Sequence, residues 1–467
     1  MQVYNTLGRA TEEFFPRVAG EVSIYVCGPT VQSAPHVGHG RQAVAFDVIR
    51  RYLSWRGYRV HFVTNITDVE DKIIAAAAER GISTQEVADE ATAQFLGAYR
   101  LLGVGDPDAL LYATEHIDQM LETIGRLVER GHAYPAGGSV WFAVRSLPAY
   151  GKLSGRNPDE LQSGARIEPG EEKRDPLDFA LWKAAKPGEP SWESPWGPGR
   201  PGWHIECSAM AEAELGFGFD IHGGGLDLVF PHHENEIAQS EAAAGAEPFA
   251  RYWLHNGMVR LKGEKMAKST GMVVGLLDVL DRYPPEAVRL FYLRAHYRQP
   301  IDFGEEAMAD AAAAVERLWA FRRRGGVTDA VPDSAAVERF TVAMDDDFNT
   351  SRALAVLYDV VREGNRHLDA GEDAGPYLAA FDEFTSVLGL TESAAGSDDL
   401  AAPLAELAEA FGVEPGAPDE IIEALIARRT AARENREWAA ADGIRDRLAD
   451  IGITLEDGAD GTTWHRS

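Results

Sequence analysis

Two histidines and two glutamates lie close together in the segment FPHHENEIAQS, residues 230–240. His232 and Glu236 are four residues apart, so a helix would place them on one face, one turn removed. The chain also has two cysteines, Cys27 and Cys207. Because zinc typically takes four ligands from cysteine, histidine and carboxylate side chains, these four residues could form one metal site. In the other interpretation, His232 caps a helix, Glu236 lies at the surface and both cysteines are small core residues.

A second group of residues suits the binding of phosphate. In the segment APHVGHGRQA, His36 and His39 flank Gly38. The segment opens a predicted helix, and a helix N-terminus attracts anions. Gly38 would let a bound group approach the backbone closely. The alternative interpretation is a turn that glycine makes easy.

A third segment, KGEKMAKSTG at residues 262–271, combines glycine with clustered lysines, among them Lys265 and Lys268. Such a loop can clamp phosphates, although an exposed basic loop is the default interpretation. Lysine is otherwise scarce in this chain, which makes the cluster notable. There is no GxxxxGKS or GxxxxGKT motif, so an ordinary P-loop for ATP is not expected.

The neighbouring sequence predicts the elements that position these residues. EVSIYVCGPT is predicted to be a buried strand, RQAVAFDVIRRYLSWRG a helix that ends at Gly57, and YRVHFVTNITD a second strand. Strand, helix and strand in this order indicate a parallel sheet. Ligands bind at the carboxyl ends of such strands, where Cys27 and residues 64–68 lie. Cys207 is predicted to begin the helix CSAMAEAEL, which could pack at the same edge.

The rest of the chain divides into regions that differ in composition and residue pattern. A stretch rich in Pro, Gly and Trp, KAAKPGEPSWESPWGPGRPGW, cannot be a long regular element and indicates an insertion in the sheet domain. Beyond about residue 306 the pattern is helical and rich in Ala. Clusters of Gly, Ser, Asp and Pro at 391–402 and 412–418 predict a hinge to a small C-terminal module.

Bulk composition is typical of a soluble globular protein, except for its charge. A length of 467 residues predicts several domains, and no apolar run is long enough to cross a membrane. No secretory signal is seen at the N-terminus, so we expect a cytoplasmic protein with free or metal-bound thiols. The formal net charge of −29 indicates a solvated acidic surface or adaptation to a salt-rich cytosol. By itself, this charge argues against a nucleic-acid partner.

The motifs together resemble a known family. His36-Val37-Gly38-His39 resembles the HIGH signature of class I aminoacyl-tRNA synthetases, and Lys265-Met266-Ala267-Lys268-Ser269 resembles their KMSKS loop. The closer similarity is to the cysteinyl-tRNA synthetase family, in the segments YVCGPTV, NITDVEDKI, PGWHIECSAM, IHGGGLDLVFPHHENEIAQS, DDDFNTSRAL and IRDRLADIGITLEDGADGTTW. Val37 replaces the usual isoleucine, and Ala267 replaces a serine and so removes one hydroxyl from the phosphate loop.

The resemblance implies an activity and its site residues. The enzyme would activate L-cysteine with ATP and Mg²⁺ to cysteinyl-adenylate, then transfer it to the 3′ end of tRNA(Cys), releasing AMP and pyrophosphate. One zinc ion, held by Cys27, Cys207, His232 and Glu236, would select the substrate thiol over the hydroxyl of serine. The implied substrate-cysteine contacts are Thr67, Trp203 and His222; the ATP contacts are His36, Gly38, His39, Lys265 and Lys268; the catalytic residues are His36, His39 and Lys268.

The resemblance also implies an architecture. The fold class would be α/β, with a Rossmann-like catalytic domain built on a parallel sheet, split by an insertion and followed by a helical bundle and a small anticodon-binding module. The expected regions are 1–112 and 199–250 (catalytic halves), 113–198 (connective insertion), 251–305 (stem-contact region with the KMAKS loop), 306–395 (helical bundle) and 400–467 (anticodon-binding module). A monomer is expected.

A tRNA partner has to be reconciled with the negative charge. The tail carries Arg428, Arg429, Arg433, Arg436, Arg445 and Arg447, which could form a local basic strip for phosphates. Trp438 or Trp464 could stack on an anticodon base. Alternatively, these arginines pair with neighbouring acidic residues and Trp438 belongs to a core.

Two other functions stay open at this point. A relative of the family, the ligase that joins cysteine to a glucosaminyl-inositol in mycothiol synthesis, shares the zinc site and both signatures but lacks the tail that this chain has. The other alternative is a non-catalytic, zinc-stabilised RNA-binding paralogue. The presence of both signature histidines and both signature lysines argues against that paralogue.

Overall fold

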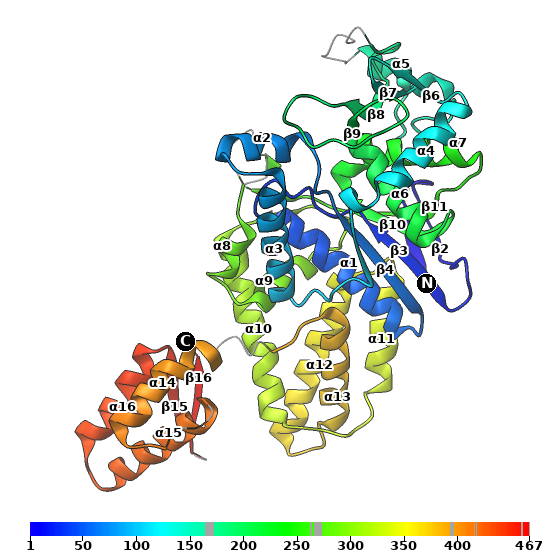
Figure 1. Cartoon of the computed structure of the whole chain (residues 1–467). Helices are drawn as coiled ribbons and strands as arrows, with labels where there is room; N and C mark the ends of the chain where they lie inside the picture. Colours follow the sequence, from blue (N-terminus) through cyan, green and yellow to red (C-terminus); the bar gives the residue numbers. More distant parts are fainter. Residues whose placement is uncertain are drawn as a thin grey trace. The chain divides into compact units, whose positions relative to one another are not determined.

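The computed structural model divides the chain into two compact units, Met1–Thr391 and Glu392–Ser467 (Figure 1). The residues that it describes are 1–163, 172–261, 264–265, 273–392, 397–414, 416, 418–458 and 461–466.

A five-stranded parallel sheet forms the centre of the first unit, with the strand order β11-β10-β3-β4-β5. Its strands are β3 (Glu21–Val26), β4 (Arg59–Ile66), β5 (Ala109–Tyr112), β10 (Phe219–Gly225) and β11 (Ala250–Asn256). The helix α1 (Val37–Trp55) connects β3 to β4, as the sequence predicts. It ends just before Gly57, whose φ of 90° favours a residue without a side chain.

The two faces of this sheet carry separate cores, because side chains alternate along each strand. Ile24 and Val26 pack on the face that α1 covers, in a core that also contains Phe46. Tyr25 and Cys27 belong to the core on the other face. That second core includes residues of α4 (Ile117–Glu129), α6 (Trp203–Leu215) and α7 (Glu234–Ala244).

Most of a small antiparallel sheet lies in the predicted insertion, 113–198, and its last strand follows directly after residue 198. Its strands pair in the order β6-β7-β8-β9 and are β6 (Ala133–Ala136), β7 (Ser139–Phe142), β8 (Phe179–Ala184) and β9 (Gly199–Pro201). The stretch rich in Pro, Gly and Trp mainly joins β8 to β9, so it lies between short strands rather than in one long element.

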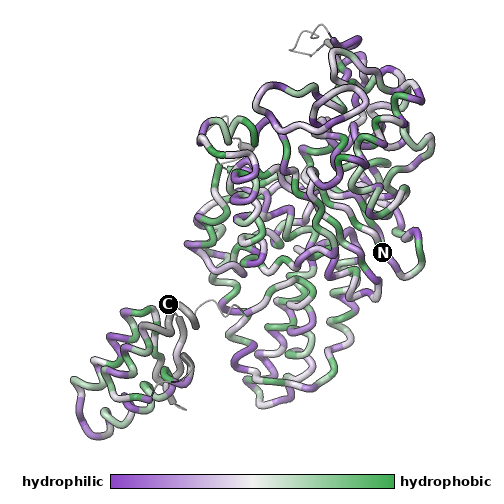
Figure 2. The backbone as a smooth tube through the Cα atoms, viewed as in Figure 1, coloured by the Kyte–Doolittle hydropathy of each residue, from purple (hydrophilic) through white to green (hydrophobic). Residues whose placement is uncertain are grey.

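The remaining elements of the first unit are short strands, helices that pack near the sheet, and the helices of a bundle. The strands are β1 (Gln2–Asn5), β2 (Ala10–Glu13), β12 (Val259–Leu261), β13 (Glu264–Lys265) and β14 (Ile301–Phe303). The helices are α2 (Asp71–Arg80), α3 (Thr84–Leu101), α5 (Pro158–Ser163), α8 (Leu276–Leu280), α9 (Pro285–Leu293), α10 (Glu305–Gly325), α11 (Ser334–Asp345), α12 (Thr350–Ala370) and α13 (Gly375–Leu388). Hydrophobic and hydrophilic residues alternate along the bundle helices (Figure 2), as expected when each helix buries one face.

The second unit has its own core of Leu404, Ile422, Leu425, Leu448 and Ile453. Its elements are α14 (Ser397–Phe411), α15 (Pro418–Glu434), α16 (Trp438–Asp450), β15 (Ile453–Gly458) and β16 (Gly461–Arg466). Trp438 is 59% exposed, so its alternative assignment to a core is wrong, whereas Trp464 packs against that core. Among the helices of the described residues, none has both the length and the apolar character needed to cross a membrane.

Candidate functional site

Cys27, Cys207, His232 and Glu236 meet at the carboxyl edge of the central sheet. One sulfur, nitrogen or oxygen atom from each lies within 4.8 Å of those of the other three, and all four side chains are buried. Cys27 directly follows β3, and Cys207 lies in the second turn of α6. Glu236 lies in the first turn of α7, and His232 lies in the segment just before it. Four residues from three parts of the chain therefore form one cluster.

One local prediction about this cluster needs correction. Cys207 does not begin its helix, because α6 starts at Trp203 after the extended residue Gly202. His232 lies in the short helical segment Val229–His233, which has a non-helical residue at Phe230 and leads directly into α7. The separation of four residues still brings His232 Nε2 to 3.1 Å from Glu236 Oε1.

Burial sets the protonation of the cluster in the absence of a metal. It raises the pKa of the Cys27 thiol well above its usual value and lowers the pKa of His232 to about 3, so that the imidazole is neutral at physiological pH. Burial alone would raise the pKa of Glu236, but the nearby His222 and His232 lower it overall. Glu236 is therefore a buried carboxylate in its ionised form.

Glu236 has no positively charged arginine or lysine to balance it among the described residues. Its ion-pair partners are His222, His232 and His233, and the Cys27 sulfur lies 3.4 Å from its Oε1. A buried carboxylate that has no arginine or lysine partner is costly unless a cation joins it. Two thiols, one imidazole and one carboxylate are a donor set that suits a divalent zinc ion. A second overlapping set, Cys27, His222, His233 and Glu236, also brings one possible ligand atom from each residue within 4.8 Å of the others.

The three residues expected near a bound cysteine lie around this cluster. The Trp203 ring stacks on the His232 ring, with 4.3 Å between centroids. His222 Nε2 lies 2.9 Å from Glu236 Oε2. Thr67 is buried, and its hydroxyl accepts a hydrogen bond of 3.3 Å from Asn65. Trp203 and His222 thus contact candidate ligands directly, whereas Thr67 is linked to Cys207 through Asn65, whose Oδ1 lies 3.7 Å from the Cys207 sulfur.

Sequence reasoning missed part of the surrounding shell. His204 Nδ1 lies 3.0 Å from His232 Nδ1, and His255 Nε2 lies 2.7 Å from His233 Nδ1. Trp253 stacks on His222 at 4.3 Å. A signal for His204 was present, because it lies three residues before Cys207 and so on the same helix face. His255 and Trp253 lie on the strand beside His222, and only the pairing of the strands reveals this.

The two signature histidines build the N-terminus of α1. His36 is the N-cap residue, and its Nδ1 accepts a hydrogen bond of 3.1 Å from the Gly38 N–H. His39 Nδ1 accepts one of 3.1 Å from the His36 N–H, and the two rings stack at 3.6 Å. A Cβ atom at Gly38 would lie 2.9 Å from His36 Cε1. Glycine at this position therefore makes room for the His36 ring as well as for any ligand.

The structure describes the backbone of only one of the two signature lysines. Lys265 lies on β13, whose backbone pairs with β12 at Arg260. Lys268 lies outside the described residues. The part of the lysine segment that can be described therefore belongs to a three-stranded sheet of β12, β13 and β14.

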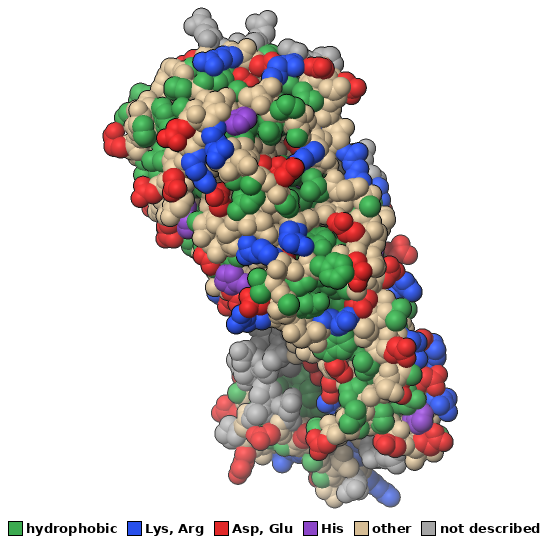
Figure 3. Space-filling model, turned by 90° about the vertical axis from the view of Figure 1, so that its right-hand side faces the viewer, with side chains coloured by type: hydrophobic (Ala, Val, Ile, Leu, Met, Phe, Trp, Pro, Cys, Tyr) green, Lys and Arg blue, Asp and Glu red, His purple; other side chains and the backbone are tan. Residues whose placement is uncertain are grey.

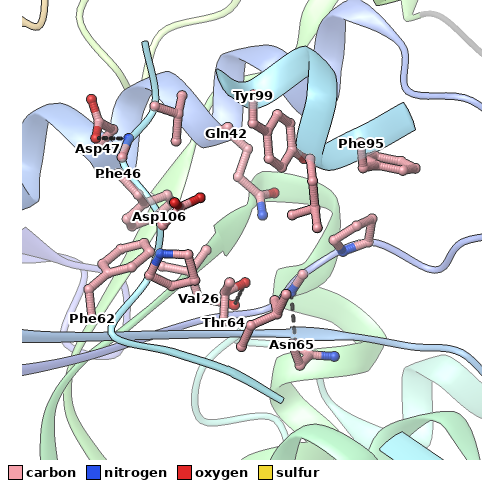
Figure 4. Close-up of a pocket in the computed structure, with 18 of the residues that line it drawn as sticks. Val26, Gln42, Phe46, Asp47, Phe62, Thr64, Asn65, Phe95, Tyr99 and Asp106 are labelled. Carbon is pink, nitrogen blue, oxygen red and sulfur yellow. Dashed lines mark hydrogen bonds between the residues drawn. The ribbon is translucent and has the colours of Figure 1, made fainter. Parts of the chain in front are cut away.

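A separate pocket lies on the α1 face of the sheet (Figure 4). Its lining is mostly apolar and includes Val26, Phe46, Phe62, Phe95 and Tyr99. The metal-ligand candidates lie on the opposite face of β3, since Val26 and Cys27 are successive residues of an extended segment. This pocket is not the candidate site, because its mostly apolar lining suits neither a metal nor a triphosphate.

Comparisons with known proteins decide the family. A model described as the tRNA synthetases class I (C) catalytic domain matches residues 13–313. A DALR domain matches 339–392, and a cysteinyl-tRNA ligase anticodon binding domain matches 414–464. A cysteine–tRNA ligase of Alkalilimnicola ehrlichii is 51% identical to this chain over the full length of both. The chain belongs to the cysteinyl-tRNA synthetase family. A cysteine–tRNA ligase of Halorhodospira halophila, also aligned over the full length of both chains, is 50% identical.

Solved structures agree with the fold of this cysteinyl-tRNA synthetase family member. The methionyl-tRNA synthetase of Mycobacterium tuberculosis in complex with methionyl-adenylate superposes with a TM-score of 0.59 at 17% identity. The similarity covers 82% of this chain and 94% of that chain, and it concerns the fold alone. The resemblance in the sequence motifs and the class I fold are thus both confirmed. The match at 414–464 does not favour the mycothiol ligase or the non-catalytic paralogue.

Proposed function

We propose that this chain is a cysteine–tRNA ligase that works through the buried cluster at the sheet edge. It activates L-cysteine with ATP and transfers the cysteinyl group to the 3′ end of tRNA(Cys). The observation that carries the proposal is the convergence of Cys27, Cys207, His232 and Glu236 within 4.8 Å, in a chain related over its full length to cysteine–tRNA ligases.

The four cluster residues are proposed to hold one Zn²⁺. When bound, zinc would accept the substrate thiol as a further ligand and lower its pKa, which favours thiolate over the hydroxyl of serine. Such chemical discrimination can reject serine without an editing site. The close contacts among the two thiols, one imidazole and one buried carboxylate support this assignment.

Thr67, Trp203 and His222 are proposed to contact the bound cysteine. Trp203 lies against His232 and would exclude water from one side of the thiol. His222 would hold Glu236 in position through its Nε2 contact of 2.9 Å. The Thr67 hydroxyl would offer a polar contact to the backbone groups of the substrate.

ATP, with Mg²⁺, is proposed to bind at the N-terminus of α1 and the lysine segment, through His36, Gly38, His39, Lys265 and Lys268. The cysteine carboxylate attacks the α-phosphorus, and the bond to pyrophosphate breaks. His36 and His39 would contact the phosphates in the transition state, and Lys268 would neutralise the leaving pyrophosphate. The 3′-terminal ribose hydroxyl of the tRNA then attacks the adenylate carbonyl, and AMP leaves. Catalysis rests on positioning and charge stabilisation, with no covalent enzyme intermediate.

We propose that the regions expected from the sequence have separate functions in activation and in tRNA binding. Residues 1–112 and 199–250 would carry out activation, with 113–198 as a connective insertion. Residues 251–305 and the bundle at 306–395 would contact the tRNA, and 400–467 would read the anticodon. A monomer in the cytoplasm is the proposed working form.

ATP–pyrophosphate exchange with the zinc-loaded chain tests the activation step. We expect exchange that depends on cysteine and falls about 100-fold or more when serine replaces it, the size of discrimination that a chemical contact gives. Equal exchange with both amino acids, or none with cysteine, would overturn the proposal.

A further inference from the structure

Arg41 follows the second signature histidine by two residues and is 1% exposed. Its guanidinium donates to five backbone carbonyl oxygens. Nε donates to the carbonyl of Gly257 at 3.0 Å, and Nη1 donates to that of Tyr292 at 3.4 Å. Nη2 donates to the carbonyls of Gln299 at 2.5 Å, His296 at 3.2 Å and Tyr297 at 3.3 Å. Within the described residues, no carboxylate forms an ion pair with it.

Four of the five acceptors of Arg41 lie just before two strands, and the fifth, Tyr292, lies in α9. Gly257 precedes β12, and Gln299 precedes β14. These strands pair in parallel, and β12 also pairs with β13, where Arg260 lies opposite Lys265. A Cβ atom at Gly257 would lie 2.4 Å from the Gln299 carbonyl oxygen, so the two backbones approach as closely as glycine permits. One side chain of α1 thus holds the sheet that carries the first signature lysine.

The chain that follows the lysine segment is joined to the α1 N-terminus at a second place, outside the sheet of β12, β13 and β14. The Val37 N–H donates to the Val274 carbonyl at 3.1 Å, and the Leu276 N–H donates to the Pro35 carbonyl at 2.9 Å. These bonds join backbone to backbone and depend on no side chain. On the β12 and β14 side, by contrast, the connection through the guanidinium depends on a single residue.

Stability alone does not account for a guanidinium in this place. Burial lowers the pKa of Arg41 to about 10, which reflects the cost of removing its charge from water. A buried charge is usually paired with an opposite charge, and an apolar residue of similar volume often stabilises a protein more. The rigid planar fork of arginine does, however, fix several carbonyls at once, which an apolar side chain cannot do.

We propose that Arg41 is a positioning residue for adenylate formation: it fixes the sheet that bears Lys265 relative to the α1 N-terminus that bears His36 and His39. This inference rests on the proposed function and deepens it. A triphosphate that is bound by the histidines of α1 and by the lysine segment reacts only when both are correctly placed around it. A displacement of about 1 Å can lower the rate by about 100-fold. Arg41 is buried and its guanidinium donates to backbone carbonyls, so it would act by positioning other groups.

Arg289 provides a matched control. It is also 1% exposed and also contacts α1, through Asp47. Its other acceptors are the carbonyls of Leu388, at 2.8 Å, and Leu102, at 2.9 Å. None of these partners lies in the sheet of β12, β13 and β14, so its loss should affect packing without changing that register.

The experiment compares Arg41→Lys and Arg289→Lys in the full-length, zinc-loaded chain. Lysine keeps the charge but loses the planar fork. Cysteine-dependent ATP–pyrophosphate exchange would be measured together with KM for each substrate, zinc content and Tm. We expect both variants to lose stability, but only Arg41→Lys to lower kcat, by about 100-fold, with zinc content and KM for cysteine unchanged.

Equal kcat values for the two variants would overturn the positioning role, as would a loss of zinc in Arg41→Lys that accounts for its defect. If Arg41→Lys does not fold, Arg41→Gln is compared in the same way, because its amide still donates to carbonyls.

The chain without substitutions distinguishes a failure of the proposed function from a failure of the Arg41 inference. If it shows no cysteine-dependent exchange, the proposed function fails; if it is active and Arg41→Lys matches Arg289→Lys, only this inference fails.

Discussion

Glu236 is the residue on which the candidate metal centre depends most directly. Its two oxygens face His222, His232 and the Cys27 sulfur, and within the described part of the chain no arginine or lysine balances its charge. A metal ion would supply that charge. The neighbouring Glu234 is equally buried, but its carboxylate accepts hydrogen bonds from the backbone N–H groups of Gly151, at 2.9 Å, and Ser154, at 2.7 Å. The two glutamates therefore allow the metal role to be separated from burial.

Replacing Glu236 with glutamine keeps the shape of the side chain and removes its charge. We expect zinc affinity to fall by about 100-fold or more, the upper range for residues that only support a ligand. Competition with a chelator measures this change. Glu234→Gln is the control and should leave zinc affinity within about threefold. Equal zinc affinity in both variants would remove Glu236 from the ligand set.

Gly38 tests the proposed role of the signature histidines. In Gly38→Ala the new methyl group would meet the His36 ring at 2.9 Å, so the ring must move by a few tenths of an ångström. We expect kcat for pyrophosphate exchange to fall by about tenfold to 100-fold with little change in Tm, because positioning is lost before packing. Gly97→Ala is the control, since nothing lies within 4 Å of its added methyl group. A normal kcat in Gly38→Ala would show that the position of the His36 ring does not matter for activation.

At the scale of elements, α1 links the sheet to the rest of the first unit. Its N-terminus carries the signature histidines, and its middle carries Asp47, which is bonded to Arg289 of α9 and to Arg50 and Arg51. Burial alone would raise the pKa of Asp47, but Arg289 and Arg51 lower it overall. Because its pKa is depressed in the folded state, this carboxylate stabilises the fold above its unfolded pKa, and the contribution is lost as the pH falls through its folded pKa.

The corresponding test is Asp47→Asn, which leaves Arg289 buried without its partner. We expect the free energy of unfolding to fall by about 3–5 kcal/mol at pH 7, the usual cost of breaking a buried ion pair. Urea unfolding of both proteins at several pH values would measure the difference. It should be constant near neutrality and shrink below about pH 4, where the unfolded carboxyl becomes protonated. A difference that is the same at all pH values would contradict the account.

The elements also show what could be predicted from the sequence. The strand that ends at Cys27 and the connecting helix were predictable, because their apolar patterns and the glycine at position 57 are local signals. The start of α6 at Trp203 is four residues earlier than the predicted start at Cys207, since Trp203 and His204 carry no sequence signal for the first turn of a helix. The stacking of Trp253 on His222 and the pairing of His255 with His233 arise from contacts between strands and helices distant in sequence. No local pattern encodes such contacts.

At the scale of the whole molecule, the net charge of −29 has to coexist with a nucleic-acid substrate. On the face drawn in Figure 3, acidic and basic side chains are interspersed rather than separated into patches. In the second unit, Arg445 pairs with Asp442 and Asp446, so the alternative interpretation holds for this residue. Trp438 is exposed and remains the better of the two predicted stacking residues.

The two compact units predict that activation and tRNA recognition can be separated. A chain that ends at residue 391 lacks the second unit but keeps the candidate metal centre and α1. We expect its cysteine-dependent pyrophosphate exchange to stay within about twofold of the full chain, and its charging of tRNA to fall by about 100-fold, as anticodon contacts of a few kcal/mol are lost. Parallel loss of both activities in a folded, zinc-loaded protein would show that the two steps are not divided in this way.

Aminoacylation of total tRNA with labelled cysteine would show directly whether this chain is a cysteine–tRNA ligase. The full-length, zinc-loaded chain would be assayed with ATP and Mg²⁺ at low and high salt, with labelled serine in a parallel reaction. We expect cysteine, but not serine, to become attached to tRNA in an ATP-dependent reaction. Pyrophosphate exchange without any charging, or no activity at either salt concentration, would contradict the assignment as a cysteine–tRNA ligase.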